Sequence, residues 1–214
     1  MTHRPSWLYL AIGGVSWPVV KVLFRHRARG VEHVPPSGGV VLAANHWSNF
    51  DPWPLAMPFF PRRFFRFMAK AELFWFPLGW IVSACGAFRV RRGEQDEEAF
   101  ATAIDLARAG SVVVMFPEGT RGYPGQRLRY KVGGAHLAVK TGAMVIPVAH
   151  NAGDCWPRDT FIKRPGLITL VFGPPIASGG MTAEALNEKV EAWIESEMRR
   201  RFPHQYQSSS AKDR

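Results

Sequence analysis

The chain has 214 residues, of which 47% are apolar, so it can form one domain with a sizeable core and is not disordered over most of its length. Its 27 Lys and Arg residues outnumber its 17 Asp and Glu residues, which gives a formal net charge of +10 at pH 7. Such a charge favours nucleic acid, an anionic membrane or phosphorylated small molecules as partners, although a compositional bias of the genome would also raise the Arg content. The two cysteines, Cys85 and Cys155, match no metal-binding or redox spacing, so we expect free thiols in a reducing compartment.

The N-terminal stretch is predicted to be an apolar helix. Residues 7–24 are mostly apolar, with Pro18 and Lys21 as interruptions, and a basic cluster follows around Arg25 and Arg29. Because crossing a bilayer takes about 20 apolar residues, we expect the segment to dip into one leaflet with its basic cluster at the headgroups. An ordinary buried helix is the alternative. We therefore divide the chain into a membrane-associating helical segment (1–28), one domain (29–202) and a polar flexible tail (203–214).

Short apolar runs alternate with helical patterns along the rest of the chain. The predicted strands cover residues 39–44, 64–68, 87–91, 111–116, 143–149 and 167–172. The predicted helices cover residues 94–109, 132–141 and 182–201, the last with Thr182 as its N-cap. Strands that are apolar throughout and alternate with helices are typical of a single α/β domain with a central, largely parallel sheet flanked by helices.

His46 and Asp51 form the first candidate site. His46 follows the predicted strand 39–44 after only one residue, at the position where parallel α/β folds place their chemistry. Asp51 precedes Pro52, a pairing typical of a helix start. Positions i and i+5 do not share a helix face, so the side chains can meet only across a turn. Asp51 would then fix one imidazole nitrogen and leave the other as a base for an attacking hydroxyl. Either residue alone fits a structural role equally well, as a cap or a turn residue.

The second candidate is the motif FPEGTR at residues 116–121, directly after the predicted strand 111–116. Gly119 permits a backbone angle that other residues avoid, and amides near it can stabilise a developing oxyanion. Arg121 offers a fork of donors that suits phosphate. A surface turn with a solvated arginine is the alternative.

Together these segments resemble the glycerolipid acyltransferase family, of the lysophosphatidate (1-acylglycerol-3-phosphate) acyltransferase type. The family pattern NHxSxxDxxP is similar to NHWSNFDPWP at residues 45–54, and FPEGTR occurs unchanged. The family's strand ending in Arg resembles residues 86–93, where Arg92 takes the matching position. Its apolar strand with a central Pro resembles residues 145–148, and the basic position between these elements resembles Lys131. The resemblance covers about residues 30–175.

The resemblance implies a role for each matching residue. His46 is the general base and Asp51 its orienting partner. The residues implied to bind the acceptor and its phosphate are Arg92, Glu118, Gly119, Thr120, Arg121 and Lys131. The implied reaction moves a fatty acyl group from acyl-CoA or acyl carrier protein to lysophosphatidic acid, forming phosphatidic acid at the cytoplasmic face of the cell membrane. Neither a metal nor a bound cofactor is expected.

Several alternatives stay open at this level. The acceptor can instead be glycerol 3-phosphate, a lysophospholipid or another hydroxylated lipid, and a non-catalytic lipid-binding protein would not need His46. A nucleic-acid binder would account for the charge but for neither motif. The seven His residues show no metal-binding spacing. An acyl tunnel, if present, would use apolar residues such as those within 73–82.

Overall fold

The computed structural model describes residues 5–91, 96–123, 125–158 and 163–206. The strands are β1 (Phe24–Arg29), β2 (Val40–Ala44), β3 (Phe65–Lys70), β4 (Ala87–Val90), β5 (Val112–Met115), β6 (Met144–His150) and β7 (Gly166–Phe172). The helices are α1 (Trp7–Leu23), α2 (Pro52–Ala56), α3 (Leu78–Ala84), α4 (Glu97–Arg108), α5 (Gly133–Thr141), α6 (Ala152–Cys155) and α7 (Ala183–Arg201). Short 3-10 turns are η1 (Val31–His33), η2 (Met57–Phe59), η3 (Ala71–Leu73) and η4 (Pro203–Tyr206).

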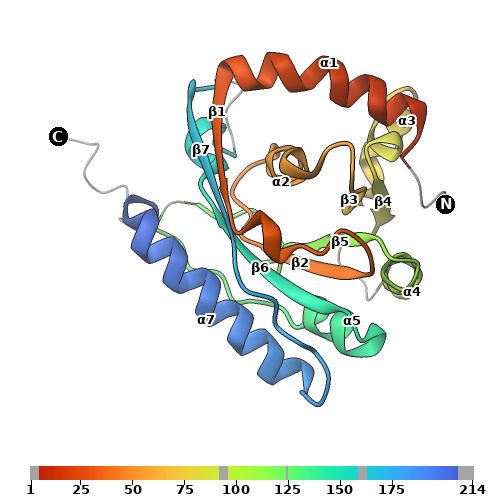
Figure 1. Ribbon diagram of the computed structural model, residues 1–214, viewed down its shortest axis with the longest axis vertical. Coiled ribbons are helices and arrows are strands. Elements are labelled where there is room, and N and C mark those ends of the chain that lie inside the picture. The colour runs from red at the N-terminus through yellow and green to blue at the C-terminus, as the bar shows by residue number, and fades with distance from the viewer. Residues whose placement is uncertain (1–4, 92–95, 124, 159–162, 207–214) are drawn as a thin grey trace.

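The seven strands form one sheet in the order β1-β7-β6-β2-β5-β3-β4 (Figure 1). Every neighbouring pair is parallel except β6 and β7. The central strand β2 reads VVLAA, and all five of its residues are buried, as expected when helices cover both faces of a parallel sheet. The prediction of a largely parallel α/β domain is confirmed.

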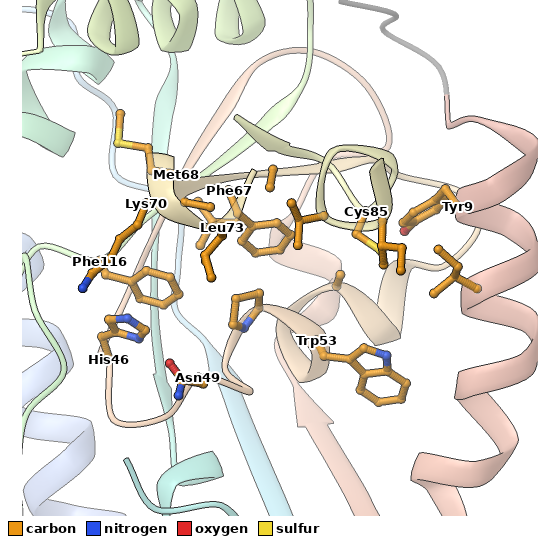
Figure 2. A pocket seen from close by; sticks show the side chains of 18 of the residues that line it. Tyr9, His46, Asn49, Trp53, Phe67, Met68, Lys70, Leu73, Cys85 and Phe116 are labelled. Carbon is orange, nitrogen blue, oxygen red and sulfur yellow. The ribbon is translucent and has the colours of Figure 1, made fainter. Parts of the chain in front are cut away.

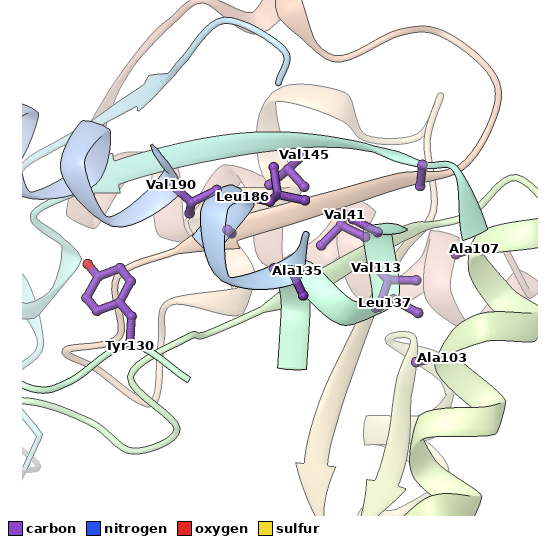
Figure 3. Packing of buried hydrophobic residues seen from close by; sticks show 14 of the residues in the cluster. Val41, Ala103, Ala107, Val113, Tyr130, Ala135, Leu137, Val145, Leu186 and Val190 are labelled. Atoms are coloured by element: carbon purple, nitrogen blue, oxygen red, sulfur yellow. The ribbon is translucent and has the colours of Figure 1, made fainter. Parts of the chain in front are cut away.

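Helices cover the sheet from both sides (Figure 1). On one face α4, α5 and α7 pack against alternate strand residues such as Val41, Val113 and Val145 (Figure 3). On the other face Val40, Leu42 and their neighbours pack toward α1 and α2. Because adjacent strand residues point to opposite faces, each apolar strand serves both cores at once.

The predicted strands after residue 38 all form, with ends that differ by one or two residues. The helices predicted for residues 94–109, 132–141 and 182–201 appear as α4, α5 and α7, and residues 94 and 95 lie outside the described part. Thr182 Oγ1 accepts the N–H of Ala185 at 3.2 Å, so the predicted N-cap is confirmed. Cys85 and Cys155 carry free thiols, as expected.

Two predicted boundaries are corrected. The N-terminal helix ends at Leu23, and residues 24–28 of the predicted segment belong to β1, which pairs in parallel with β7. This edge strand reads FRHRAR, with Phe24 buried and its arginines exposed at every second position, and these arginines led the segment to be interpreted as a basic cluster. At the other end, η4 packs onto the domain: Gln205 is 2% exposed, and its carbonyl accepts the N–H of Gly125 at 2.8 Å. The predicted flexible tail therefore begins too early, and residues 207–214 lie outside the described part.

Helix α1 spans 17 residues and docks on the domain by its inner face. Tyr9 packs edge-on against Phe64, with ring centroids 4.9 Å apart. Ser16 Oγ accepts the indole N–H of Trp53 at 3.2 Å and thereby links α1 to α2. Within the described residues, no helix combines the length and the apolar character needed to cross a bilayer.

Candidate active site

The turn between β2 and α2 brings His46 and Asp51 together. His46 Nδ1 lies 2.8 Å from Asp51 Oδ2. The same oxygen accepts the backbone N–H groups of Trp47 and Ser48 at 2.8 and 2.9 Å. The carboxylate therefore folds back onto its own turn and makes no side-chain cap on α2, which excludes the alternative that Asp51 serves only as an N-cap. An ionised Asp51 accepts the Nδ1 hydrogen and leaves the lone pair of His46 on Nε2, the arrangement of an oriented general base.

The FPEGTR loop and the next residue, Gly122, make three contacts with His46. The Phe116 ring stacks on the imidazole, with centroids 4.0 Å apart and planes 16° apart. Glu118 Oε2 accepts the backbone N–H of His46 at 2.9 Å. The N–H of Gly122 donates to the carbonyl of His46 at 2.8 Å. The two motifs, separated by about 70 residues in sequence, thus form one rigid unit because β2 and β5 are neighbours in the sheet.

Glu118 is buried inside this unit. The pKa of its carboxyl is raised to about 8, chiefly by burial; the charge of Asp51 also raises it, and the hydrogen bond from the His46 N–H opposes the shift. The resemblance implied that Glu118 lines the acceptor site. The structure instead directs its side chain to the backbone of His46, and Glu118 is not among the described residues that line the cavity below.

A cavity of about 630 Å³ opens beside His46 (Figure 2). Gly119 and Arg121, from the loop that contacts His46, contribute to its lining. His46 lies at one end, and Tyr9 and Cys85 lie at the opposite end. Most of the remaining wall is apolar and comes from α1, α2, β3, η3, α3 and β4. Leu73, Ile81 and Val82 from the predicted tunnel segment 73–82 contribute to it. The volume falls in the range of small-molecule sites, about 300–1,000 Å³.

The other predicted acceptor residues lie around the loop. Gly119 has φ +69°, and a Cβ at this position would lie 2.8 Å from Lys131 Cε, so glycine lets the lysine side chain lie against the loop. Arg121 Nη1 donates to the carbonyl of Arg158 at 3.4 Å, which helps to orient the guanidinium. Lys131 and Thr120 do not line the cavity within the described residues. Arg92 lies outside the described part of the chain.

Two contributions to the site escaped the sequence analysis. Lys70 ends β3, next to β5 in the sheet, and its side chain lines the cavity near Phe116 and His46 (Figure 2). A lysine just past the predicted strand 64–68 was the available signal. The second is helix α1, whose inner residues Tyr9, Gly13 and Ser16 form a cavity wall at helical spacing. Among the described residues, no three His, Cys, Asp or Glu side chains group in a way that could hold a metal ion.

The family model described as Acyltransferase matches residues 25–151, which include both motifs. The chain belongs to the acyltransferase family. This acyltransferase chain is 31% identical over 210 residues to the 1-acyl-sn-glycerol-3-phosphate acyltransferase of Pseudomonas aeruginosa, covering 95% of this chain and 77% of the relative. It is 29% identical to the mouse 1-acyl-sn-glycerol-3-phosphate acyltransferase alpha, covering 75% of this chain and 58% of that protein.

This chain is also similar in fold to an acyltransferase whose structure has been solved. The crystal structure of the 1-acyl-sn-glycerophosphate (LPA) acyltransferase PlsC from Thermotoga maritima superimposes with a TM-score of 0.75 at 26% identity. The match covers 90% of this chain and 77% of that one. The similarity therefore includes most of the sheet and the helices that flank it.

Proposed function

We propose that this acyltransferase moves a fatty acyl group from a thioester, acyl-CoA or acyl carrier protein, to the free hydroxyl of lysophosphatidic acid and so forms phosphatidic acid. The observation that carries the proposal is the His46–Asp51 dyad at one end of a largely apolar cavity, with Lys70 and Arg121 beside it. The names of the bacterial and mouse relatives support the same acceptor. Glycerol 3-phosphate or another hydroxylated lipid is the second choice of acceptor.

The proposed reaction needs no enzyme nucleophile. His46 Nε2 takes the proton of the acceptor hydroxyl while the oxygen attacks the thioester carbonyl, and Asp51 stabilises the imidazolium that forms. The tetrahedral oxyanion collapses, the C–S bond breaks, and the thiolate receives the proton from His46. The ester bond has then replaced the thioester bond, and the dyad returns to its starting state. No metal or bound cofactor enters this proposal.

In the proposal, the basic side chains bind the phosphate of the acceptor and the apolar cavity holds an acyl chain. Arg121 and Lys70, with Lys131 against the loop, provide positive charge for a phosphate near the base. Arg92 is proposed for the same phosphate on the resemblance alone. The apolar part of the cavity suits an acyl chain, which places the carbonyl end near His46 and the methyl end toward Tyr9 and Cys85.

We also propose that the protein works on the cytoplasmic surface of the cell membrane. The outer face of α1 exposes Trp7, Val15 and Val22, and the nearby segment 73–81 exposes Trp75, Phe76, Trp80 and other large apolar side chains. Helices α1 and α3 contact each other, so the two sets belong to one side of the molecule. An apolar helix face and interfacial aromatics are typical of proteins that insert into one leaflet. Free thiols agree with a cytoplasmic setting.

An acceptor panel tests the reaction. Purified protein with one labelled acyl-CoA should acylate lysophosphatidic acid faster than glycerol 3-phosphate or lysophosphatidylcholine. His46→Ala should lower kcat by about a hundredfold or more, because a general base contributes roughly 10²–10⁴. His136→Ala, at an exposed histidine on α5, is the control and should keep full activity. If no acceptor supports thioester turnover, the proposed acyltransferase activity is refuted. If only glycerol 3-phosphate is acylated, the acceptor is glycerol 3-phosphate instead of lysophosphatidic acid.

A second measurement tests the anion site. Arg121→Ala should raise the apparent KM for lysophosphatidic acid by about tenfold or more, since a charged hydrogen bond contributes about 1.5–3 kcal/mol. The KM for acyl-CoA should change much less. The control is Arg127→Ala, an exposed arginine near the same loop that pairs with Glu191. An equal rise in both KM values for Arg121→Ala would contradict the assignment.

A further inference from the structure

Beside the dyad lies a second histidine that the proposed mechanism does not use. His150 ends β6, which pairs in parallel with β2 so that Val148 lies opposite Ala44. Beyond that pair, the segments that follow the two strands remain hydrogen-bonded. The side-chain amide of Asn45 donates to the carbonyl of His150 and accepts its backbone N–H, both at 2.9 Å. His150 is thereby fixed next to the segment that carries His46, at the same edge of the sheet.

The surroundings of His150 select its protonation state. The N–H of Ala152 donates to His150 Nδ1 at 3.3 Å, so this nitrogen carries the lone pair and the hydrogen resides on Nε2. The side chain is completely buried, and this burial lowers the pKa of the imidazole and keeps it neutral. His150 therefore presents a hydrogen-bond donor inside the protein.

Asp51 offers the complementary acceptor. Its Oδ2 receives the donors of the catalytic turn, whereas Oδ1 is buried and has no hydrogen-bond partner within the described part of the chain. The same is true of His150 Nε2. An unsatisfied buried donor and an unsatisfied buried acceptor both raise the free energy of the fold, which favours a water that bridges them.

The charged groups of the dyad also act on the His150 imidazole. The charge of Asp51 raises the pKa of the His150 imidazole, and the charge of His46 lowers it. Asp154 on α6 also raises this pKa. Both members of the dyad are thus among the charged groups that act on His150.

We propose that His150 is a positioning residue for the dyad: its Nε2–H binds Asp51 Oδ1 through one buried water and fixes the carboxylate that orients His46. The inference rests on the proposed acyl transfer, because His150 acts through the base of that reaction. A donor on Oδ1 draws electron density from the carboxylate and weakens its hold on the protonated base. Without this donor, the base should stay protonated to higher pH.

Two substitutions distinguish the roles of the two ring nitrogens of His150. The amide nitrogen of Asn takes the place of Nδ1, whereas the amide nitrogen of Gln takes the place of Nε2. His150→Asn should lower kcat roughly tenfold, keep both KM values within about twofold, and move the acid-side midpoint of the kcat/KM profile upward by about half a pH unit. His150→Gln should restore the wild-type midpoint. His136→Asn, on the exposed face of α5, is the control and should change neither quantity.

An active wild type with an unchanged midpoint in His150→Asn, or the same shift in both amide variants, would overturn the proposal. Nitrogen NMR of wild-type protein with labelled histidine provides a test that needs no variant. A neutral His150 with its hydrogen on Nε2 between pH 6 and 8 is expected, and a charged ring or an Nδ1–H tautomer would overturn the proposal. A wild type without thioester turnover would instead refute the proposed function and would leave the NMR outcome to decide the tautomer.

Discussion

Two buried carboxyl groups hold the catalytic turn, and each bonds a different part of it. Asp51 places one oxygen on the His46 ring and on the backbone of the turn. Glu118 takes the backbone N–H of His46 and ties the turn to the FPEGTR loop. Because burial raises the pKa of Glu118 to about 8, this group is mostly protonated at pH 7, and it acts as a neutral hydrogen-bonding brace.

The raised pKa of Glu118 predicts how stability depends on pH. The carboxyl of an unfolded chain loses its proton near pH 4.5, whereas the folded group keeps it up to about pH 8. Between these values the folded state binds more protons, so the free energy of unfolding should fall as pH rises. Glu118→Gln keeps the acceptor for His46 and has no proton to lose. The Tm of Glu118→Gln relative to that of the wild type should therefore rise as the pH increases from 5 to 8.

Thermal unfolding of both proteins at half-unit pH steps measures this difference. Glu98→Gln, on the exposed surface of α4, is the control and should keep a constant offset from the wild type. A Tm difference between Glu118→Gln and the wild type that stays constant from pH 5 to 8 would show that Glu118 is ionised throughout.

At the scale of elements, α1 has two apolar faces with different surroundings. Tyr9, Gly13 and Ser16 face the cavity, whereas Val15 and Val22 are 72% and 84% exposed. A helix that is apolar all round needs a second apolar environment for its outer face. In the proposed function, the lipid leaflet supplies this environment.

Changing only the outer face of α1 tests that role. The double substitution Val15→Glu and Val22→Glu should weaken binding to anionic phosphatidylglycerol vesicles by about tenfold or more, because it removes apolar contacts and adds like charge. Activity on substrate dispersed in detergent should stay near wild type, since these side chains do not line the cavity within the described residues. Val139→Glu, on an exposed site of α5, is the matched control. Unchanged vesicle co-sedimentation of the double variant would contradict membrane contact through α1.

At the scale of the whole molecule, the cavity joins elements that are distant in sequence. Its wall includes parts of α1, α2, β3, α3 and β4, with His46 at one end and Cys85 near the other (Figure 2). A closed far end would limit the length of the acyl chain that fits.

Cys85→Phe should therefore shift donor preference toward shorter chains. Each methylene that can no longer be buried costs about 0.8 kcal/mol, so excluding two of them should lower kcat/KM for a 16-carbon donor by roughly tenfold relative to a 12-carbon donor. Cys85→Ser keeps the volume and is the control. Competition between the 16-carbon and 12-carbon acyl-CoA donors gives the ratio of their kcat/KM values directly. The same ratio in the wild type, Cys85→Phe and Cys85→Ser would show that the acyl chain does not reach Cys85.

The sequence predicted the elements best where a residue's neighbours in sequence also determine its environment. Apolar runs such as residues 40–44 form strands because helices cover both faces of the sheet. The alternating pattern of β1 was missed because half of its side chains are arginines at an exposed edge. The inner face of α1 was missed as a cavity wall because its partners come from elements more than 30 residues away.

The sequence by itself predicted the largely parallel α/β architecture and the turn across which His46 and Asp51 can meet, because both depend on patterns within a few residues. Through the family resemblance it also implied that Arg121 serves the same site. Only the tertiary structure decided that Glu118 supports His46 instead of facing the cavity, and that α1 closes the cavity. The physical reason is that burial and hydrogen-bond partners depend on which strands are neighbours in the sheet, and strand order is a long-range property that no local pattern encodes.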